Sequence, residues 1–508
     1  MIRHRRLLLK MLSIGGLATL TLTGCMVGPD FKQLPPPKAE KYTYLPVPQK
    51  TVSASQNPNA GKSQHLIAGR DLQGDWWTIF HSTSLNKLIL EGLQNNQDLV
   101  AAKAALREAN YTLYAQVGGL LLPSVNFNGG AQQVQTNGLT FGTNTLPTST
   151  FNIFNASFGA SYLLDIWGAS RRQIEALAAQ ADYERYTMIA TYLTLTTNIA
   201  TTAITIASLQ DQIKATEKLI IAQKKILNIT RKQFSVGGVS YENVLTQQTL
   251  LAQTEATMPP LRQSLSQEQH ALAVLIGKQT NVQKPLKIAL NKIILPKNIP
   301  VSLPSKIITQ RPDIQASEAL LHAASANVGV ATANLLPQVT LSAAYGWQSS
   351  TTTNFFSAQN EAWNYGAALL QPIFHGGQLI LQRKAAIAAL DQARAQYEQT
   401  VLQAFKNIAD ALRAIQFDAY EFKDQALAEK TAYATLILTE KQYQVGGQNY
   451  LAVLNAQEQY QQIVLSRVKA QAARYTDTAA LYQTLGGGWW NNKIINNYGV
   501  IAHRSWYH

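Results

Sequence analysis

The hydrophobic positions of this 508-residue chain follow a helical period over two unusually long stretches. Residues 169–236 and 378–445 are each 68 residues long and contain neither glycine nor proline. Because glycine and proline usually end helices, each stretch predicts one uninterrupted helix, about 100 Å long at 1.5 Å per residue. The second stretch carries an apolar stripe whose spacing lies between that of a straight helix and that of a coiled coil. Its members are Leu390, Ala393, Tyr397, Val401, Ala404, Ile408, Ala411, Ile415, Ala419 and Phe422.

The two long stretches begin 209 residues apart, and the segments that follow them also repeat. Each stretch ends in a Val-Gly-Gly turn, at 236–238 and 445–447, and a shorter helix is predicted to return from each turn. The first return is interrupted by Pro259 and Pro260 and ends at Gly277, whereas the second continues to about Leu485. The duplication and the helix length predict one elongated protein made of two related halves.

Before each long stretch the spacing of the hydrophobic residues changes from a helical repeat to alternation at every second residue. Residues 124–164 contain no charged side chain, and residues 338–370 contain only Glu361. Each interval predicts two strands around a polar loop, at 135–150 and 348–360, with an apolar face and a face of small polar residues, which is typical of transmembrane β-strands. A soluble hairpin explains any one of these strands but not four in duplicate in an exported chain. The apolar faces comprise Phe154, Ala156, Phe158, Ala160, Tyr162 and Leu164; Val339, Leu341, Ala343, Tyr345 and Trp347; and Trp363, Tyr365, Ala367 and Leu369.

A further helix is predicted before the first strands. It begins at Ser84, a residue that caps helices well, and continues without proline to about Leu121. Residues 188–209 inside the first long helix are uncharged, but the equivalent part of the second carries five charges. Equivalent helices should share one solvent, so we reject a membrane-spanning helix there.

The chain starts with the pattern of an export signal. Basic residues precede a short apolar run at 11–22, which ends in Leu-Thr-Gly before Cys25. This ending resembles the bacterial lipobox, so Cys25 is predicted to become a lipidated N-terminus; a buried or free thiol is the weaker alternative. In such lipoproteins an Asp after the cysteine favours the inner membrane, and Met26 therefore indicates the outer membrane.

The predicted domains follow from these patterns. Residues 26–75 are rich in proline and read as an extended tether, and no structure is predicted for the C-terminal tail. The complete division is a signal peptide (1–24), a lipidated N-terminal tether (25–83), repeat 1 (84–277), an inter-repeat linker (278–310), repeat 2 (311–488) and the tail (489–508).

Composition excludes several functions. The net charge is +14, but the charges are spread along predicted helices instead of clustering with aromatic residues, so nucleic-acid binding is not expected. The eight histidines are dispersed, and the sequence has no HExxH, GxSxG or phosphate-binding glycine loop. We expect no enzyme activity, no metal site and no cofactor other than the lipid on Cys25.

Several short motifs follow one another along the chain. They are CMVGPDF from Cys25, Trp76-Trp77, LAVLIG ending at Gly277, QRPDI from Gln310, the two Val-Gly-Gly turns, and LGGGW from Leu485. This ordered set, which covers about residues 25–489, resembles the TolC/NodT-type outer-membrane efflux lipoproteins. Arg311-Pro312-Asp313 belongs to the set and also has a structural interpretation, with proline at the first position of a helix and aspartate in its first turn.

The resemblance implies a membrane α+β fold: a trimeric 12-stranded β-barrel, with four strands per chain, continued by a long periplasmic α-helical barrel with internal duplication. Counting agrees, since four strands cannot close a barrel and an open strand edge is not tolerated in lipid. The implied function is a passive outer-membrane exit channel for drugs, toxic compounds or metals. Its implied partners are a periplasmic adaptor and an inner-membrane pump. The alternatives are a structural envelope-spanning outer-membrane lipoprotein or a type I secretion duct.

The resemblance also places a periplasmic gate at the two glycine turns. Relatives carry acidic residues just after the second turn, whereas this chain has Ala452 and Asn455 there and Asn243 at the first turn. We therefore predict closure by packing of Leu451 and by neutral hydrogen bonds from Gln448, Asn449 and Asn455, with easier opening and weak binding of divalent cations. The predicted gate residues are Val236, Gly237, Gly238, Glu242 (the only nearby acid), Asn243, Tyr443 (the family's aromatic), Val445, Gly446, Gly447, Gln448, Leu451, Ala452 and Asn455.

Overall fold

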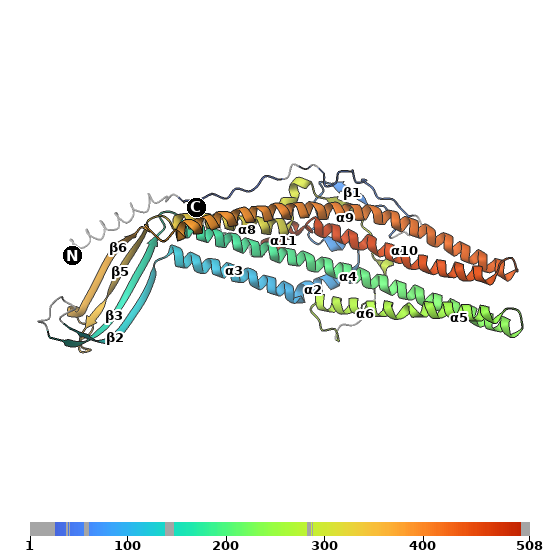
Figure 1. The fold of residues 1–508 in the computed structure, drawn as a ribbon, viewed down its shortest axis with the longest axis horizontal. Coiled ribbons are helices and arrows are strands. Elements are labelled where there is room, and N and C mark those ends of the chain that lie inside the picture. Colours follow the sequence, from blue (N-terminus) through green and yellow to red (C-terminus); the bar gives the residue numbers. More distant parts are fainter. Residues whose placement is uncertain are drawn as a thin grey trace.

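The computed structural model shows an elongated molecule with a small sheet at one end and two helical hairpin tips at the other (Figure 1). It describes residues 26–498 except for 37–38, 40, 55–59, 138–146, 282–285 and 287. Cys25 and the predicted signal peptide lie outside the described residues, as does the end of the tail from residue 499.

Four antiparallel strands form the sheet at one end of the molecule. They are β2 (Ser124–Thr136), β3 (Ser149–Leu164), β5 (Gln338–Ser349) and β6 (Glu361–Leu370), in the order β2-β3-β5-β6. Phe158 lies opposite both Phe127 and Tyr345, and Tyr345 lies opposite Trp363, so the predicted apolar faces join into one surface across the sheet. The predicted strands are confirmed, as is the prediction that their apolar residues share one face of the sheet.

The two long helices are nearly identical in extent. Helix α4 spans Ala169–Ser235 and α9 spans Gln378–Gln444, 67 residues each. Each follows a glycine in the left-handed region, Gly168 (φ 78°) or Gly377 (φ 83°). Both predicted helices are therefore confirmed to within one residue. The middle of the predicted α9 stripe, from Tyr397 to Phe422, is largely buried, which is the expected result for a packed face.

The helix predicted from Ser84 to Leu121 is two helices, α2 (Thr83–Asn95) and α3 (Gln97–Leu121). Asn96 causes the break, because its side chain accepts a hydrogen bond from the Leu99 backbone and donates one to the Leu275 carbonyl oxygen. The predicted cap is also wrong by two residues, since Ser82 caps α2. The return helices agree with prediction: α5 (Tyr241–Ala256) and α6 (Met258–Leu275) are separate, and α10 (Tyr450–Thr484) is continuous.

The helices form a curved layer one helix thick. Near the sheet the packed neighbours run α3, α4, α8 (Pro312–Ala333) and α9; nearer the tips α4 packs against α5, α6 and α10, and α10 packs against α9. Residues 188–209 of α4 lie in this packed region, and among the described residues no helix is long and apolar enough to cross a membrane.

The tether, linker and tail meet around the middle of the molecule. Strand β1 (His65–Ala68) of the tether pairs in parallel with β4 (Asn298–Val301) of the linker. Beside them Trp76 is fully buried and stacks on Tyr482, with ring centroids 5.7 Å apart. The remaining short elements are η1 (Trp76–Phe80), η3 (Leu290–Lys292), η4 (Pro304–Lys306), α7 (Ile307–Gln310) and η5 (Ala358–Asn360).

The sequence assigns no structure to the tail, but the first part of the tail is folded. It forms η6 (Trp489–Asn491) and α11 (Lys493–Asn497). Trp489 is 5% exposed, and Asp71 of the tether accepts hydrogen bonds from Trp490 Nε1 and Asn491 Nδ2, both at 2.9 Å. Trp489 Nε1 donates to the Gln310 carbonyl oxygen, 179 residues earlier, and the Asp71 partner of Trp490 lies 419 residues earlier, so no local pattern predicts these contacts.

Candidate functional site

Two matching turns form the end of the molecule opposite the sheet (Figure 1). Gly237 (φ 78°) and Gly446 (φ 76°) adopt the left-handed conformation that ends α4 and α9. The backbone N–H of Gly238 donates to the carbonyl oxygen of Gln233 at 2.8 Å, and the backbone N–H of Gly447 donates to the carbonyl oxygen of Gln442 at 2.8 Å. A side chain at Gly237 or Gly446 would meet open space, so backbone conformation alone requires glycine there.

Most of the predicted gate side chains stand on the surface of the single chain. Val236 and Val445 are more than 80% exposed, and Leu451 is 57% exposed. Glu242, Gln448 and Asn455 are also exposed, while Asn243, Tyr443 and Ala452 are half-buried. The tips therefore present apolar groups, neutral polar groups and the acidic Glu242 outward.

The predicted neutral hydrogen bonds divide into two kinds. Asn449 uses its side chain to cap α10, accepting from the Ala452 backbone N–H at 2.9 Å. Within the described part of the chain, Gln448 and Asn455 make no side-chain hydrogen bond to the other hairpin. Bonds from these residues across the constriction would need neighbouring copies, so the predicted mode of closure stays a prediction.

A different set of residues joins the α4/α5 hairpin to the α9/α10 hairpin close to the tips. The hydroxyl of Tyr450, a buried residue on α10, donates to Gln247 Oε1 on α5 at 2.5 Å and lies 3.1 Å from Thr230 Oγ1 on α4. The neighbouring Tyr443 hydroxyl on α9 donates to Gln233 Oε1 on α4 at 3.3 Å. The two tyrosine rings lie 5.4 Å apart, so α9 and α10 reach across as one unit.

Further from the tip the contact between the hairpins contains both apolar and polar side chains. Leu250 on α5 packs with Tyr450 and Leu454 on α10. Thr254 on α5 donates to Gln461 on α10 at 3.2 Å, and both side chains are buried. Burial raises the pKa of the Tyr450 hydroxyl, so it stays neutral near pH 7. The polar side chains bond to water once they are separated, so the polar part of this seam costs less to open than an apolar contact of the same size.

The sequence contained a signal for this seam that was missed. Buried polar residues recur at seven-residue spacing, which puts them on one helix face. The spacing alone does not say which helix each series faces. The series are Thr216, Gln223 and Thr230 on α4, Gln247 and Thr254 on α5, and Tyr450 and Gln457 on α10.

In the described ranges no three histidine, cysteine, aspartate or glutamate side chains are arranged to hold a metal ion. Arg311, Pro312 and Asp313 have the predicted structural arrangement: Pro312 begins α8, and the Arg311 guanidinium pairs with Asp313 at 2.5 Å and bonds to the Thr484 carbonyl oxygen. A hairpin sheet continued by paired long helices with glycine tips defines the class of envelope-spanning channel subunits.

The sequence matches the outer membrane efflux protein family over residues 88–278 and 303–487, and the chain belongs to this family. It is 30% identical to the pyoverdine export outer membrane protein OpmQ of Pseudomonas putida, over 85% of this chain and 91% of that protein. It is 27% identical to the cation efflux system protein CusC of Escherichia coli O6:H1, over 92% and 97%. Its fold matches the outer-membrane channel OprN with a TM-score of 0.82 and 24% identity, over 92% of this chain and all of that one. The protein is thus an outer-membrane exit channel of a tripartite efflux pump.

Proposed function

We propose that three copies of this chain close into a 12-stranded barrel continued by a 12-helix tunnel, which serves as a passive exit duct for small molecules. The free edges of the sheet support this assembly most directly. Strands β2 and β6 are its outermost strands and run in opposite directions, so β6 of one copy can pair antiparallel with β2 of the next. An unpaired edge is not tolerated in lipid, and four strands are too few to close alone.

The helices support the same arrangement. Helix α3 leads into β2 and α9 follows β6, so the two free edges of the helical layer continue the two free edges of the sheet. Large apolar side chains are exposed on both helices, including Tyr111 (69%) on α3 and Leu402 (65%) and Phe417 (60%) on α9. When two different edges of neighbouring copies meet head to tail, the copies form a closed ring if the rotation between them closes.

The remaining parts of the proposal concern the anchor, the partners and the cargo. A lipid on Cys25 holds the chain in the outer membrane, and a periplasmic adaptor with an inner-membrane pump delivers cargo and supplies the energy. The names of the relatives mention pyoverdine and cations, which supports a small-molecule or metal-ion cargo. The duct has no catalytic role of its own.

Two measurements on the purified protein test the proposal. Native mass spectrometry of a mild-detergent extract should give three times the mass of the lipidated chain, and planar bilayers should show ion conductance. A trimer without conductance would favour the structural envelope-spanning lipoprotein instead. A stable monomer would contradict the closed barrel itself.

A further inference from the structure

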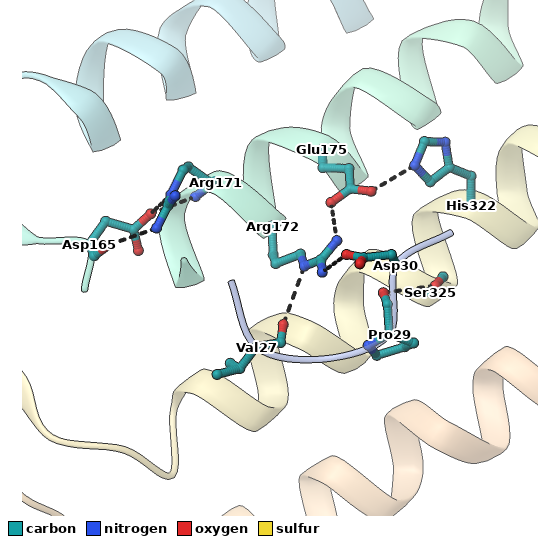
Figure 2. Close-up of polar contacts among 9 residues, drawn as sticks. All are labelled: Val27, Pro29, Asp30, Asp165, Arg171, Arg172, Glu175, His322 and Ser325. Carbon is teal, nitrogen blue, oxygen red and sulfur yellow. Dashed lines mark hydrogen bonds and ion pairs between the residues drawn. The ribbon is translucent and has the colours of Figure 1, made fainter. Parts of the chain in front are cut away.

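The start of the tether is bound to the helices by a network of charges that the channel function does not use. Figure 2 shows residues 27–30 crossing α8 with Arg172 of α4 reaching between them and Glu175. Arg172 Nη2 lies 2.5 Å from Asp30 Oδ1, Arg172 Nε donates to the Val27 carbonyl oxygen at 3.3 Å, and Arg172 Nη1 lies 2.8 Å from Glu175 Oε2. One guanidinium thus holds two points of the tether and one of its own helix.

The surface that receives the tether is buried, and helices from both repeats form it. The side chains of Arg172 and Glu175, on α4, are 1% and 9% exposed, and His322 of α8 lies 2.8 Å from the second oxygen of Glu175. Burial alone would raise the pKa of Glu175, but its bonds to His322 and Arg172 outweigh burial and hold the pKa below its usual value. The carboxylate therefore stays charged and orients the guanidinium toward the tether.

The backbone of the tether interlocks with α8. Gly28 (φ 94°) lies directly against Gly329, and a methyl group on Gly28 would overlap the Cα atom of Gly329. A methyl group on Gly329 would lie 2.9 Å from the Val27 carbonyl oxygen. Beyond this contact Phe31 stacks on His322, with ring centroids 4.4 Å apart and planes at 17°. Backbone fit, ion pair and ring stack all fall within five consecutive residues.

We propose that residues 26–33 are a docking segment and that the α4/α8 groove around Arg172, Glu175, His322 and Gly329 is its binding site, which holds the membrane anchor at the junction of sheet and helices. Met26 contacts Gly168, between the end of β3 and the start of α4. The docked segment therefore reaches the level of the junction between the sheet and the helices. If the segment undocked, the 16 residues from Met26 to Lys41, ahead of the next tether contact at Tyr42, would let the anchor move over up to about 50 Å as an extended proline-rich chain.

The consequence for the anchor rests on the proposed lipid at Cys25, but docking itself does not require lipid. Trypsin cleavage after Lys32, an exposed residue inside the docked segment, reports docking, because a protease cuts a bound segment only when it opens. The product that begins at Gln33 is identified by mass spectrometry on the full trimer. Gly329→Ala should speed this cleavage about tenfold or more, because it blocks the backbone fit. Asp30→Asn should speed it a few-fold, because it loses an ion pair in which the Asp30 side chain is 82% exposed.

Gly119→Ala is the matched control for the second variant, because Gly119 is also helical but an added methyl group there meets nothing within 4 Å. It should leave cleavage after Lys32 unchanged. Cys25→Ser should also leave it unchanged while abolishing lipid labelling, so a failed anchor and a failed docking site give different results. Rapid cleavage after Lys32 in the unmodified protein would overturn the proposal, as would unchanged cleavage in both Asp30→Asn and Gly329→Ala.

Discussion

Removing the Tyr450 hydroxyl should make the channel open more easily. The hydroxyl donates to Gln247 Oε1 at 2.5 Å and lies 3.1 Å from Thr230 Oγ1, so it joins α10 to both helices of the other hairpin. Opening the tip requires the hairpins to part. A buried neutral hydrogen bond contributes about 1 kcal/mol, so Tyr450→Phe should remove about 1–2 kcal/mol per chain from the closed state. That corresponds to an increase of about 5- to 30-fold in the open-to-closed ratio for each chain that opens, and more for the whole channel if the chains open together.

Single-channel recording in planar bilayers measures this ratio directly. Phenylalanine keeps the ring that packs on Tyr443, so only the hydroxyl changes. Tyr443→Phe should give a smaller increase, because the Tyr443 hydroxyl makes one longer bond, of 3.3 Å, to Gln233. Tyr433→Phe is the control, since Tyr433 is on the same hairpin but is 52% exposed. If Tyr450→Phe and Tyr433→Phe open equally often, the polar seam does not hold the tips closed.

Four further predictions concern other parts of the molecule. Cys25→Ser should abolish labelling by a radioactive fatty acid and leave the signal peptide unprocessed; normal processing would rule out the anchor. Phe158→Lys, on the apolar face of the sheet, should destabilise the barrel by up to about 2–4 kcal/mol per chain in denaturant titrations. Ser157→Lys, on the opposite face, should instead change ion selectivity. Equal effects of the two substitutions would mean that the strand faces are wrongly assigned. The pKa of Glu175 is lowered in the folded chain, so the stabilisation by its carboxylate is present above the usual glutamate pKa and is lost as the pH falls through the lowered value. The difference in melting temperature between the unmodified protein and Glu175→Gln should therefore be present at pH 7 and vanish in acid. Millimolar divalent cations on the tip side should block the current only weakly, and strong block that persists in Glu242→Gln would contradict a neutral constriction.

The elements that depend on neighbouring residues were predictable from the sequence. Helices α4 and α9 end where glycine permits a left-handed turn, and the period-two alternation assigned the faces of β3, β5 and β6 before any pairing was known. These features follow from backbone sterics and side-chain periodicity, which act over a few residues. The break at Asn96 was missed because a capping asparagine competes with the helix only when a partner such as the Leu275 carbonyl oxygen is in place.

The tertiary structure alone decided which polar residues meet. Tyr450 and Thr230 are 220 positions apart, Arg172 and Asp30 are 142 apart, and Trp490 and Asp71 are 419 apart. No local pattern links such pairs, because their contact depends on how the two repeats pack and on the path of the tether over them. The sequence by itself determined the two long helices, the glycine turns that end them and the alternating strands, because these features follow from local side-chain periodicity and backbone sterics. The polar seam between the hairpins and the docking site of the N-terminal segment exist only once distant helices have packed, because a hydrogen bond or ion pair needs both partners within about 3 Å.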